Sequence, residues 1–227
     1  MSEISKKYQR KLFIGSSHTW AFAQIAKADK DARVLDFGAG TGVMGEKLRE
    51  LGVSDIYAVD IDDKACQNLK KTYKQACTEL TDIKQEEFDL ILLLDILEHL
   101  THPEDFLEKI SKKLSPNGTI LISLPNIAHW SIRFSLFLGF FEYTERGLLD
   151  RTHYNHFNRR RVKRMIASIS DLKIEEMRAS TSPVEFVLPD FICDTKPFQY
   201  FSKFRLTLAN IFPGLLGYQH LIRIKKQ

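Results

Sequence analysis

Apolar residues in this chain gather in short runs, separated by segments in which they recur with helical spacing. The clearest run, Phe88–Asp95, is continuous, which is typical of a strand buried on both faces of a parallel sheet. Strands are predicted at Arg33–Phe37, Ile56–Ile61, Gln75–Thr78, Phe88–Asp95, Thr119–Leu124, Leu172–Met177 and Tyr218–Ile224.

The segments between these runs have the features of helices. Gly52 is predicted to end a helix over Val43–Leu51, and Pro103 to occupy the first turn of a helix that reaches Leu114. Further helices are predicted at Lys64–Lys74, after a cap at Ser16-Ser17, and after a cap at Asn158. Strands that alternate with helices in this way predict an α/β fold with a doubly wound, Rossmann-like sheet.

The 227 residues suffice for one domain, 1–227, with a sizeable core, and 44% of them are hydrophobic. Residues 1–30 are expected to form an N-terminal helical cover, and residues 126–165 and 180–217 to be insertions at the substrate site. The aromatic cluster Phe134–Phe141 is expected to pack on the sheet edge. Residues 180–217 are too long for a hairpin loop and are predicted to form short helices that serve as a lid, a dimer contact or a membrane dock.

Charge and composition narrow the class of protein. A net charge of +4 is too small to indicate a nucleic-acid partner. No apolar run is long enough to span a bilayer, and the first residues do not resemble a signal peptide. Three widely spaced cysteines form no even disulfide set, so we expect a cytoplasmic protein.

A glycine-rich loop follows the first strand, in the pattern Asp36-x-Gly38-x-Gly40-x-Gly42. Glycines permit positive φ and let a ligand approach the bare backbone. A nicotinamide-binding fingerprint would have its third glycine at position 43, which is valine here. The loop therefore disfavours a nicotinamide-dependent oxidoreductase, which we retain as a lesser alternative.

An acid at the end of the second strand extends this site. Asp60 lies about twenty residues beyond the loop, where a doubly wound fold places the carboxylate that binds ribose hydroxyls. Asp62 or Asp63 is assigned to capping the next helix. Either Glu79 or Asp82 could meet an adenine amino group, and the sequence does not choose between them.

Two segments together resemble the first and fourth motifs of class I S-adenosylmethionine (SAM) dependent methyltransferases: the glycine loop and the fourth strand, which ends Asp95-Ile96-Leu97-Glu98-His99-Leu100. The resemblance implies SAM as cofactor, S-adenosylhomocysteine (SAH) as product, and a seven-stranded sheet with an antiparallel last strand. Cofactor-binding residues are expected at Asp36, Gly38, Ala39, Gly40, Gly42, Asp60, Ile61, Asp95 and Ile96.

Two further strings, Pro125-Asn126-x-x-His129-Trp130 and Asp150-Arg151-Thr152-His153, resemble a branch of these enzymes associated with cell-surface polysaccharide synthesis. The branch implies O-methylation of a sugar, a glycan precursor or a related small acceptor. It also suggests association with a glycosyltransferase or a membrane surface, and a homodimer is a further expectation. A SAM-binding partner without catalytic activity is the alternative.

Methyl transfer to a hydroxyl requires a base with a pKa near neutrality, and histidine fits that role. His153 is the first candidate and His129 the second, with Asp150 to orient the base and Arg151 to hold the acceptor. Glu98 and His99 are residue types that can serve in catalysis, but the favoured interpretation is that they begin the next segment and orient the loop after the fourth strand. No metal-ligand spacing is recognisable, so no metal is expected.

Overall fold

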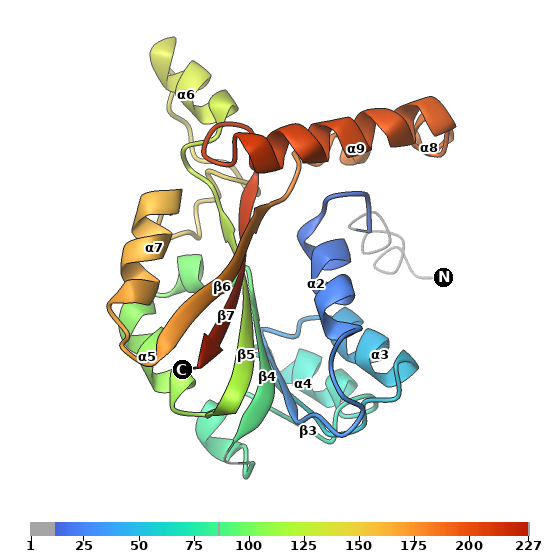
Figure 1. Ribbon diagram of the computed structural model, residues 1–227, viewed down its shortest axis with the longest axis vertical. Helices are drawn as coiled ribbons and strands as arrows, with labels where there is room; N and C mark the ends of the chain where they lie inside the picture. Colours follow the sequence, from blue (N-terminus) through green and yellow to red (C-terminus); the bar gives the residue numbers. More distant parts are fainter. Residues whose placement is uncertain (1–11, 86, 227) are drawn as a thin grey trace.

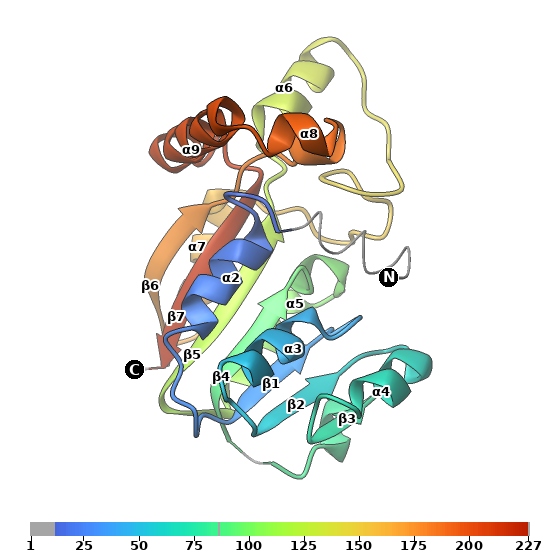
Figure 2. The same ribbon diagram turned by 90° about the vertical axis from the view of Figure 1, so that its right-hand side faces the viewer.

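The computed structural model describes residues 12–85 and 87–226, and a seven-stranded sheet runs through them. The strands are β1 (Val34–Phe37), β2 (Ile56–Val59), β3 (Gln75–Cys77), β4 (Phe88–Leu94), β5 (Leu114–Pro125), β6 (Leu172–Ala179) and β7 (Gln219–Lys226). Their order across the sheet is β3-β2-β1-β4-β5-β7-β6, with β7 antiparallel to both neighbours. The predicted doubly wound sheet with an antiparallel last strand is confirmed (Figure 2).

Helices cover both faces of the sheet (Figure 1). They are α2 (Ser17–Ile25), α3 (Val43–Glu50), α4 (Asp63–Leu69), α5 (Pro103–Ser111), α6 (Trp130–Phe137), α7 (Arg159–Ala167), α8 (Asp190–Cys193) and α9 (Lys196–Ile211). Apolar side chains of α5 and α7 pack on one face in a cluster that includes Leu107 and Val162. Those of α2, α3 and α4 pack on the other face with Ile25, Leu48 and Leu69.

Local signals in the sequence account for several of these boundaries. Ser16 caps α2 by accepting a hydrogen bond from the Thr19 N–H, and Asn158 caps α7 in the same way from Arg161. Pro103 lies in the first turn of α5. Gly52 has a φ of 87°, the left-handed conformation that ends α3.

Several predicted boundaries were wrong. Strand β5 begins at Leu114 rather than Thr119, because the Pro116-Asn117-Gly118 turn is a bulge inside the strand and not a break before it. Helix α4 ends at Leu69 rather than Lys74. Of the predicted cover over residues 1–30, residues 1–11 lie outside the described part, and the helix within the rest is α2.

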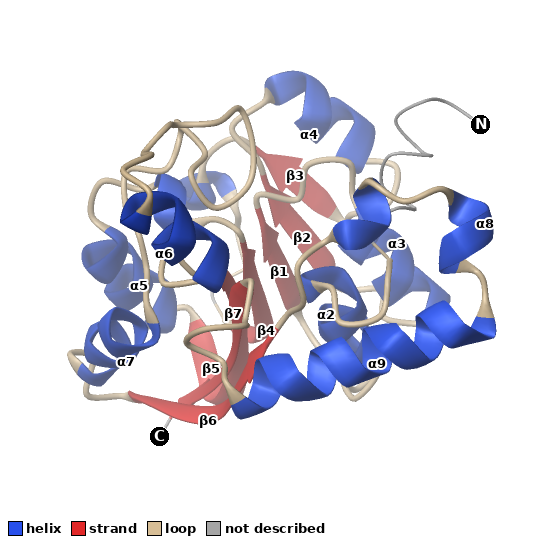
Figure 3. Ribbon diagram, turned by 90° about the horizontal axis from the view of Figure 1, so that it is seen from above, coloured by secondary structure: helices blue, strands red, loops and turns tan. Residues whose placement is uncertain are grey.

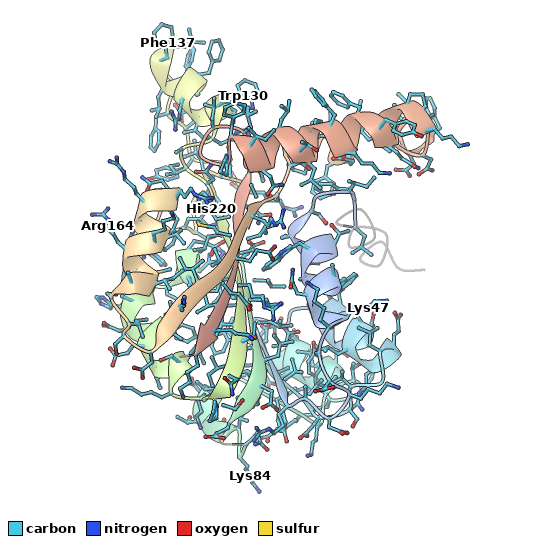
Figure 4. All side chains as sticks on the ribbon, viewed as in Figure 1. Lys47, Lys84, Trp130, Phe137, Arg164 and His220 are labelled. Atoms are coloured by element: carbon cyan, nitrogen blue, oxygen red, sulfur yellow. The ribbon has the colours of Figure 1, made fainter. Side chains whose placement is uncertain are left out.

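The two expected insertions lie beyond the carboxyl end of β5, where α6, α8 and α9 stand above the sheet (Figures 1 and 3). Helix α9 is one long helix, whereas only short helices were expected. The prediction that Phe134–Phe141 packs on the sheet was wrong as well, because Phe137 is 84% exposed at the outer end of α6 (Figure 4). Among the described residues, no helix combines the length and the apolar character needed to cross a membrane.

Candidate functional site

The glycine loop between β1 and α3 has a conformation that only glycine adopts without strain. Gly38, Gly40 and Gly42 have φ angles of 75°, 54° and 84°. A Cβ at Gly38 would lie 2.1 Å from Cδ1 of Ile96, so Ile96 packs directly on the loop backbone. A Cβ at Gly40 would meet nothing closer than 4.0 Å, so this side of the loop is open to a ligand.

Asp36 supports the loop from beneath. Its carboxylate accepts a 2.5 Å hydrogen bond from the Tyr73 hydroxyl, and that hydroxyl accepts one of 2.9 Å from the Gly45 N–H. Burial raises the pKa of Asp36 to about 6 despite the Tyr73 hydrogen bond. Asp36 was expected to bind the cofactor, but the structure places it under the loop, outside the cleft.

Asp60 lies at the end of β2, beside the open side of the loop. One carboxylate oxygen accepts a 2.7 Å hydrogen bond from the Gly40 N–H and the other a 3.0 Å bond from the Asp62 N–H. Asp62 itself caps α4, as one of the two capping assignments proposed. The neighbouring Ile61 is 96% exposed, which leaves an apolar surface next to the acid. Glu79 and Asp82 are both exposed, so the choice between them stays open.

Asp95 lies at the end of β4 and has a φ of 58°, which is uncommon for a residue other than glycine and recurs at functional sites. Its Oδ1 accepts hydrogen bonds of 2.6 Å from the Ser123 hydroxyl and 2.7 Å from the Gln219 amide. These bonds, from β5 and β7, fix the carboxylate at the edge of a cleft.

The cleft has a volume of about 970 Å³ and is formed where the strands end beneath the insertions. Of the predicted site residues, Asp95, Asp150 and His153 line it. Its other lining residues are Phe13, Ser16, Ser17, His18, Thr41, Glu98, His99, Pro125, Arg146, Gly147, Leu148, Thr181, Pro183, Phe186, Tyr218 and Gln219.

Three side chains in the cleft, those of Glu98, His99 and His153, place their carboxylate and imidazole atoms within 4.8 Å of one another. Glu98 and His99 belong to a 3-10 turn, Leu97–His99, directly after β4. Glu98 is 1% exposed, and neither of its carboxylate oxygens accepts a hydrogen bond from another described residue. The two imidazole rings have their centroids 4.8 Å apart.

Hydrogen bonds to backbone carbonyls hold the loop of residues 150–155 against this turn. The Thr152 carbonyl bonds Nδ1 of His99 at 3.2 Å, and the Asn155 N–H donates to the Glu98 carbonyl at 3.0 Å. The Asn155 side chain donates to the Leu100 carbonyl. The two segments therefore form one structural unit although 53 residues separate His99 from Thr152.

The charges around this unit explain its unusual titration. Burial raises the pKa of Glu98 well above its usual value, and the nearby Asp95 and Asp150 carboxylates act in the same direction. Burial and the neighbouring His99 lower the pKa of His153 to about 4. The His153 imidazole is therefore neutral at physiological pH. The expected role of base called for a pKa near neutrality, which His153 does not have.

The other predicted catalytic residues lie elsewhere. His129 is 2% exposed and caps α6, with Nδ1 accepting a hydrogen bond from the Ser131 N–H and Nε2 bonded to the Ser182 hydroxyl. It does not line the cleft, so its role as second base stays a prediction that this geometry does not favour. Arg151 forms an ion pair of 2.5 Å with Glu145 at the surface and does not line the cleft either.

The expectation of no metal rested on the absence of a recognisable ligand spacing, and spacing does not reveal this cluster. Glu98 and His99 are adjacent in the sequence, but the third member comes from a distant loop, so no spacing reveals the set. Nor does the sequence reveal Thr41, Tyr218 or Gln219, which reach the cleft. Gln219 reaches Asp95 because β7 pairs with β5 in a register that sets Gln219 opposite Pro125, and local patterns do not encode that register.

The chain is similar to known methyltransferases in sequence. A family model described as a methyltransferase domain matches residues 8–169, more than half of the chain. The ubiquinone biosynthesis O-methyltransferase of Bradyrhizobium diazoefficiens is 34% identical over 137 residues, 55% of this chain and 52% of the relative. The mitochondrial ubiquinone biosynthesis O-methyltransferase of Schizosaccharomyces pombe is 30% identical over 103 residues, which are 40% of this chain and 37% of the relative. The matches thus span about half the length of these curated relatives, or less.

Solved structures share the fold at low sequence identity. A SAM-dependent methyltransferase from Archaeoglobus fulgidus has a TM-score of 0.58 and 18% identity, with 94% of this chain and 96% of that one covered. The magnesium protoporphyrin IX methyltransferase from Synechocystis, solved with bound SAH, has a TM-score of 0.61 and 12% identity, with 93% and 84% covered. These likenesses concern the arrangement of the sheet and its helices.

Proposed function

Because this chain belongs to the methyltransferase-domain family, we propose that it transfers the methyl group of SAM to a hydroxyl oxygen of a small-molecule acceptor. The expected cofactor is confirmed with the family, and the nicotinamide-dependent alternative is set aside. The observation that supports the proposal most is the meeting of the glycine loop, Asp60 and Asp95 at the carboxyl ends of neighbouring parallel strands, where such folds bind their ligands.

The residues around the loop suit SAM. The open side of Gly40 lets a ligand approach the backbone, and the Asp60 carboxylate can accept hydrogen bonds from a ribose diol. The exposed Ile61 offers an apolar surface for a purine ring. When bound, SAM supplies a methyl group activated by its sulfonium. The protein positions the acceptor oxygen in line with that group and keeps water out.

The acceptor is proposed to bind on the side of the cleft formed by Glu98, His99 and His153. Methyl transfer forms an O–CH3 bond, breaks the S–CH3 bond and removes the hydroxyl proton of the acceptor. The expected histidine base narrows to His153, since this residue and not His129 lines the cleft. A neutral imidazole can accept a hydrogen bond from the acceptor, but with a pKa of about 4 it holds a full proton weakly.

The polar groups of the cleft, which include Arg146 and Asp150 beside the cluster, support a hydroxyl-rich acceptor such as a sugar or glycan precursor. The apolar side chains of Phe13, Leu148 and Phe186 in the same cleft support an aromatic hydroxyl acceptor as the second candidate. Residues 126–165 and 180–217 are proposed to form the side of the cleft at which the acceptor binds. Incubation with SAM and each acceptor class, with SAH release as the readout, separates the two. No SAH from any hydroxyl acceptor would instead favour the non-catalytic SAM-binding alternative.

The proposed associations rest on the exposed apolar side chains of α6, α8 and α9. A membrane surface, a glycosyltransferase and a second copy of the chain each remain a prediction, as does the cytoplasmic location. Sedimentation of the purified protein with and without lipid vesicles tests for binding to a membrane surface, separately from the two protein partners.

The cofactor assignment has a direct test in the Asp60→Ala variant. We expect SAM affinity to fall by about 10- to 100-fold, because charge-assisted hydrogen bonds contribute about 1.5–3 kcal/mol. Isothermal titration with SAM and SAH measures the change, with NADH as a control ligand that should not bind. Asp62→Asn, which changes the neighbouring helix cap, should bind SAM normally. Unchanged affinity in Asp60→Ala would remove the ribose assignment.

A further inference from the structure

Glu98 is the most unusual buried group in the cleft. A buried carboxylate that accepts no hydrogen bond from another described residue has lost its hydration without replacement, so it must either be protonated or have a cation beside it. Two imidazole rings already lie beside it, and the Asp95 and Asp150 carboxylates add further negative charge nearby. These surroundings favour a small cation.

The histidine rings are arranged as metal ligands usually are. His99 has Nδ1 bonded to the Thr152 carbonyl, which leaves Nε2 for another partner. Nδ1 of the His153 ring is buried and has no hydrogen-bond partner among the described residues. Metal-binding histidines commonly donate one ring N–H to a carbonyl, which fixes the tautomer and directs the other nitrogen at the ion.

From this geometry we infer that Glu98, His99 and His153 bind one divalent transition-metal ion. One carboxylate and two imidazoles suit ions such as Mn²⁺, Fe²⁺, Co²⁺ or Zn²⁺ better than Mg²⁺ or Ca²⁺, which prefer oxygen ligands. Atoms bound about 2.1 Å from one ion lie about 3–4 Å apart. The described ligand atoms lie within 4.8 Å of one another, so small side-chain rotations complete the site.

The ion would give the cluster a role that a weak histidine base does not provide. Three protein ligands leave coordination positions for acceptor oxygens on the side of the cleft. An acceptor hydroxyl bound to the ion would ionise more readily, and its proton would pass to bulk water at the mouth of the cleft while the oxygen is held for methyl transfer. Metal binding itself does not depend on the proposed function. The role in activating the acceptor rests on it.

Titration of the chelator-treated protein with Mn²⁺ alone tests the site. By electron paramagnetic resonance, we expect about one ion to bind per chain and Zn²⁺ to displace it, because Zn²⁺ binds such ligands more tightly. Glu98→Gln and His99→Gln should each weaken Mn²⁺ binding at least tenfold. The matched control is His102→Gln, an exposed histidine three residues beyond His99 and outside the cluster, which should bind as wild type does.

A failure of the metal site can be distinguished from a failure of the proposed methyl-transfer function. Wild-type protein that binds neither ion, or Glu98→Gln with wild-type affinity, would overturn the metal site, whereas SAM titration of the same samples tests the proposed function separately. If the variants do not fold, spin-echo spectroscopy of Mn²⁺ on the wild type decides. Two coupled imidazole nitrogens are expected, and their absence would overturn the inference.

Discussion

Glycines of the β1–α3 loop differ in what they contribute, although all three have positive φ. Gly38 must also lack a Cβ because Ile96 lies on it, whereas Gly40 faces open space. The spacing of the glycines predicted the loop, but the sequence did not distinguish the packing role of Gly38 from the ligand-facing role of Gly40.

Alanine at these two positions should separate stability from binding. Each variant costs about 1–2 kcal/mol for the left-handed backbone. Gly38→Ala should cost more, because Ile96 must move, while Gly40→Ala should chiefly weaken SAM binding, by tenfold or more. Urea unfolding and calorimetric titration measure the two effects. Equal losses of stability with intact SAM binding in both variants would contradict this assignment.

Individual residues of the cluster show where sequence reasoning stopped. His153 was identified from a polar string, and Glu98 and His99 from the end of β4, but their joint position depends on how the loop of residues 150–155 folds back. A hydrogen bond between the His99 ring and the Thr152 carbonyl, and one from the Asn155 N–H to the Glu98 carbonyl, create that proximity, and no local pattern encodes them. The separate residues were therefore predictable, and the metal site was not.

At the scale of elements, the central strands β1, β2 and β4 were predicted best because their apolar runs are buried on both faces. The predicted boundaries were wrong where a turn lies within an element, as at the bulge of β5.

The side chain of one residue links the starts of neighbouring strands by hydrogen bonds. Asp89 at the start of β4 accepts hydrogen bonds from the Arg33 backbone and guanidinium before β1, and from the Ser115 hydroxyl in β5.

Asp89→Asn should therefore destabilise the sheet. Its hydrogen bonds to Arg33 lower the pKa of Asp89 despite some burial, so the stabilisation is present above the unfolded-state pKa and is lost as pH falls. Because the side chain is 36% exposed, we expect a loss of about 1 kcal/mol at pH 7 that shrinks under acid conditions. Chemical denaturation at several pH values measures it. Glu87→Gln, an exposed neighbour, should change stability by less than about 0.5 kcal/mol, and an equal effect of both variants would argue against the pair.

At the scale of the whole molecule, the hydrophobic residues divide between two large cores, a small cluster around Ile132, and an exposed surface above the sheet. Exposed aromatic side chains gather there on α6 and α9, including Phe134, Phe137, Phe201 and Phe204 (Figure 4). Composition alone predicted a large core and assigned the Phe134–Phe141 cluster to it. Only the three-dimensional arrangement shows that these side chains extend away from the sheet.

A pair of phenylalanine variants tests this division. Phe137→Ala should change the free energy of unfolding by less than about 0.5 kcal/mol, because the ring is already exposed. Phe157→Ala, at a ring that is 1% exposed, should cost about 3–5 kcal/mol. Thermal and urea denaturation compare them. A large loss in Phe137→Ala would show that the outer end of α6, and not only Ile132, packs against the rest of the protein.

The position of β7 has a consequence for how the nascent chain folds. Of the strands of this sheet it is the last to leave the ribosome, yet it lies between β5 and β6. Strand β6 precedes β7 in the chain and thus has no partner in the sheet until β7 has been synthesised. Until then the backbone groups of β6 stay unpaired. Gln219, which steadies Asp95 in the cleft, arrives at the same late moment, so this contact of the cleft forms only with the last strand of the sheet.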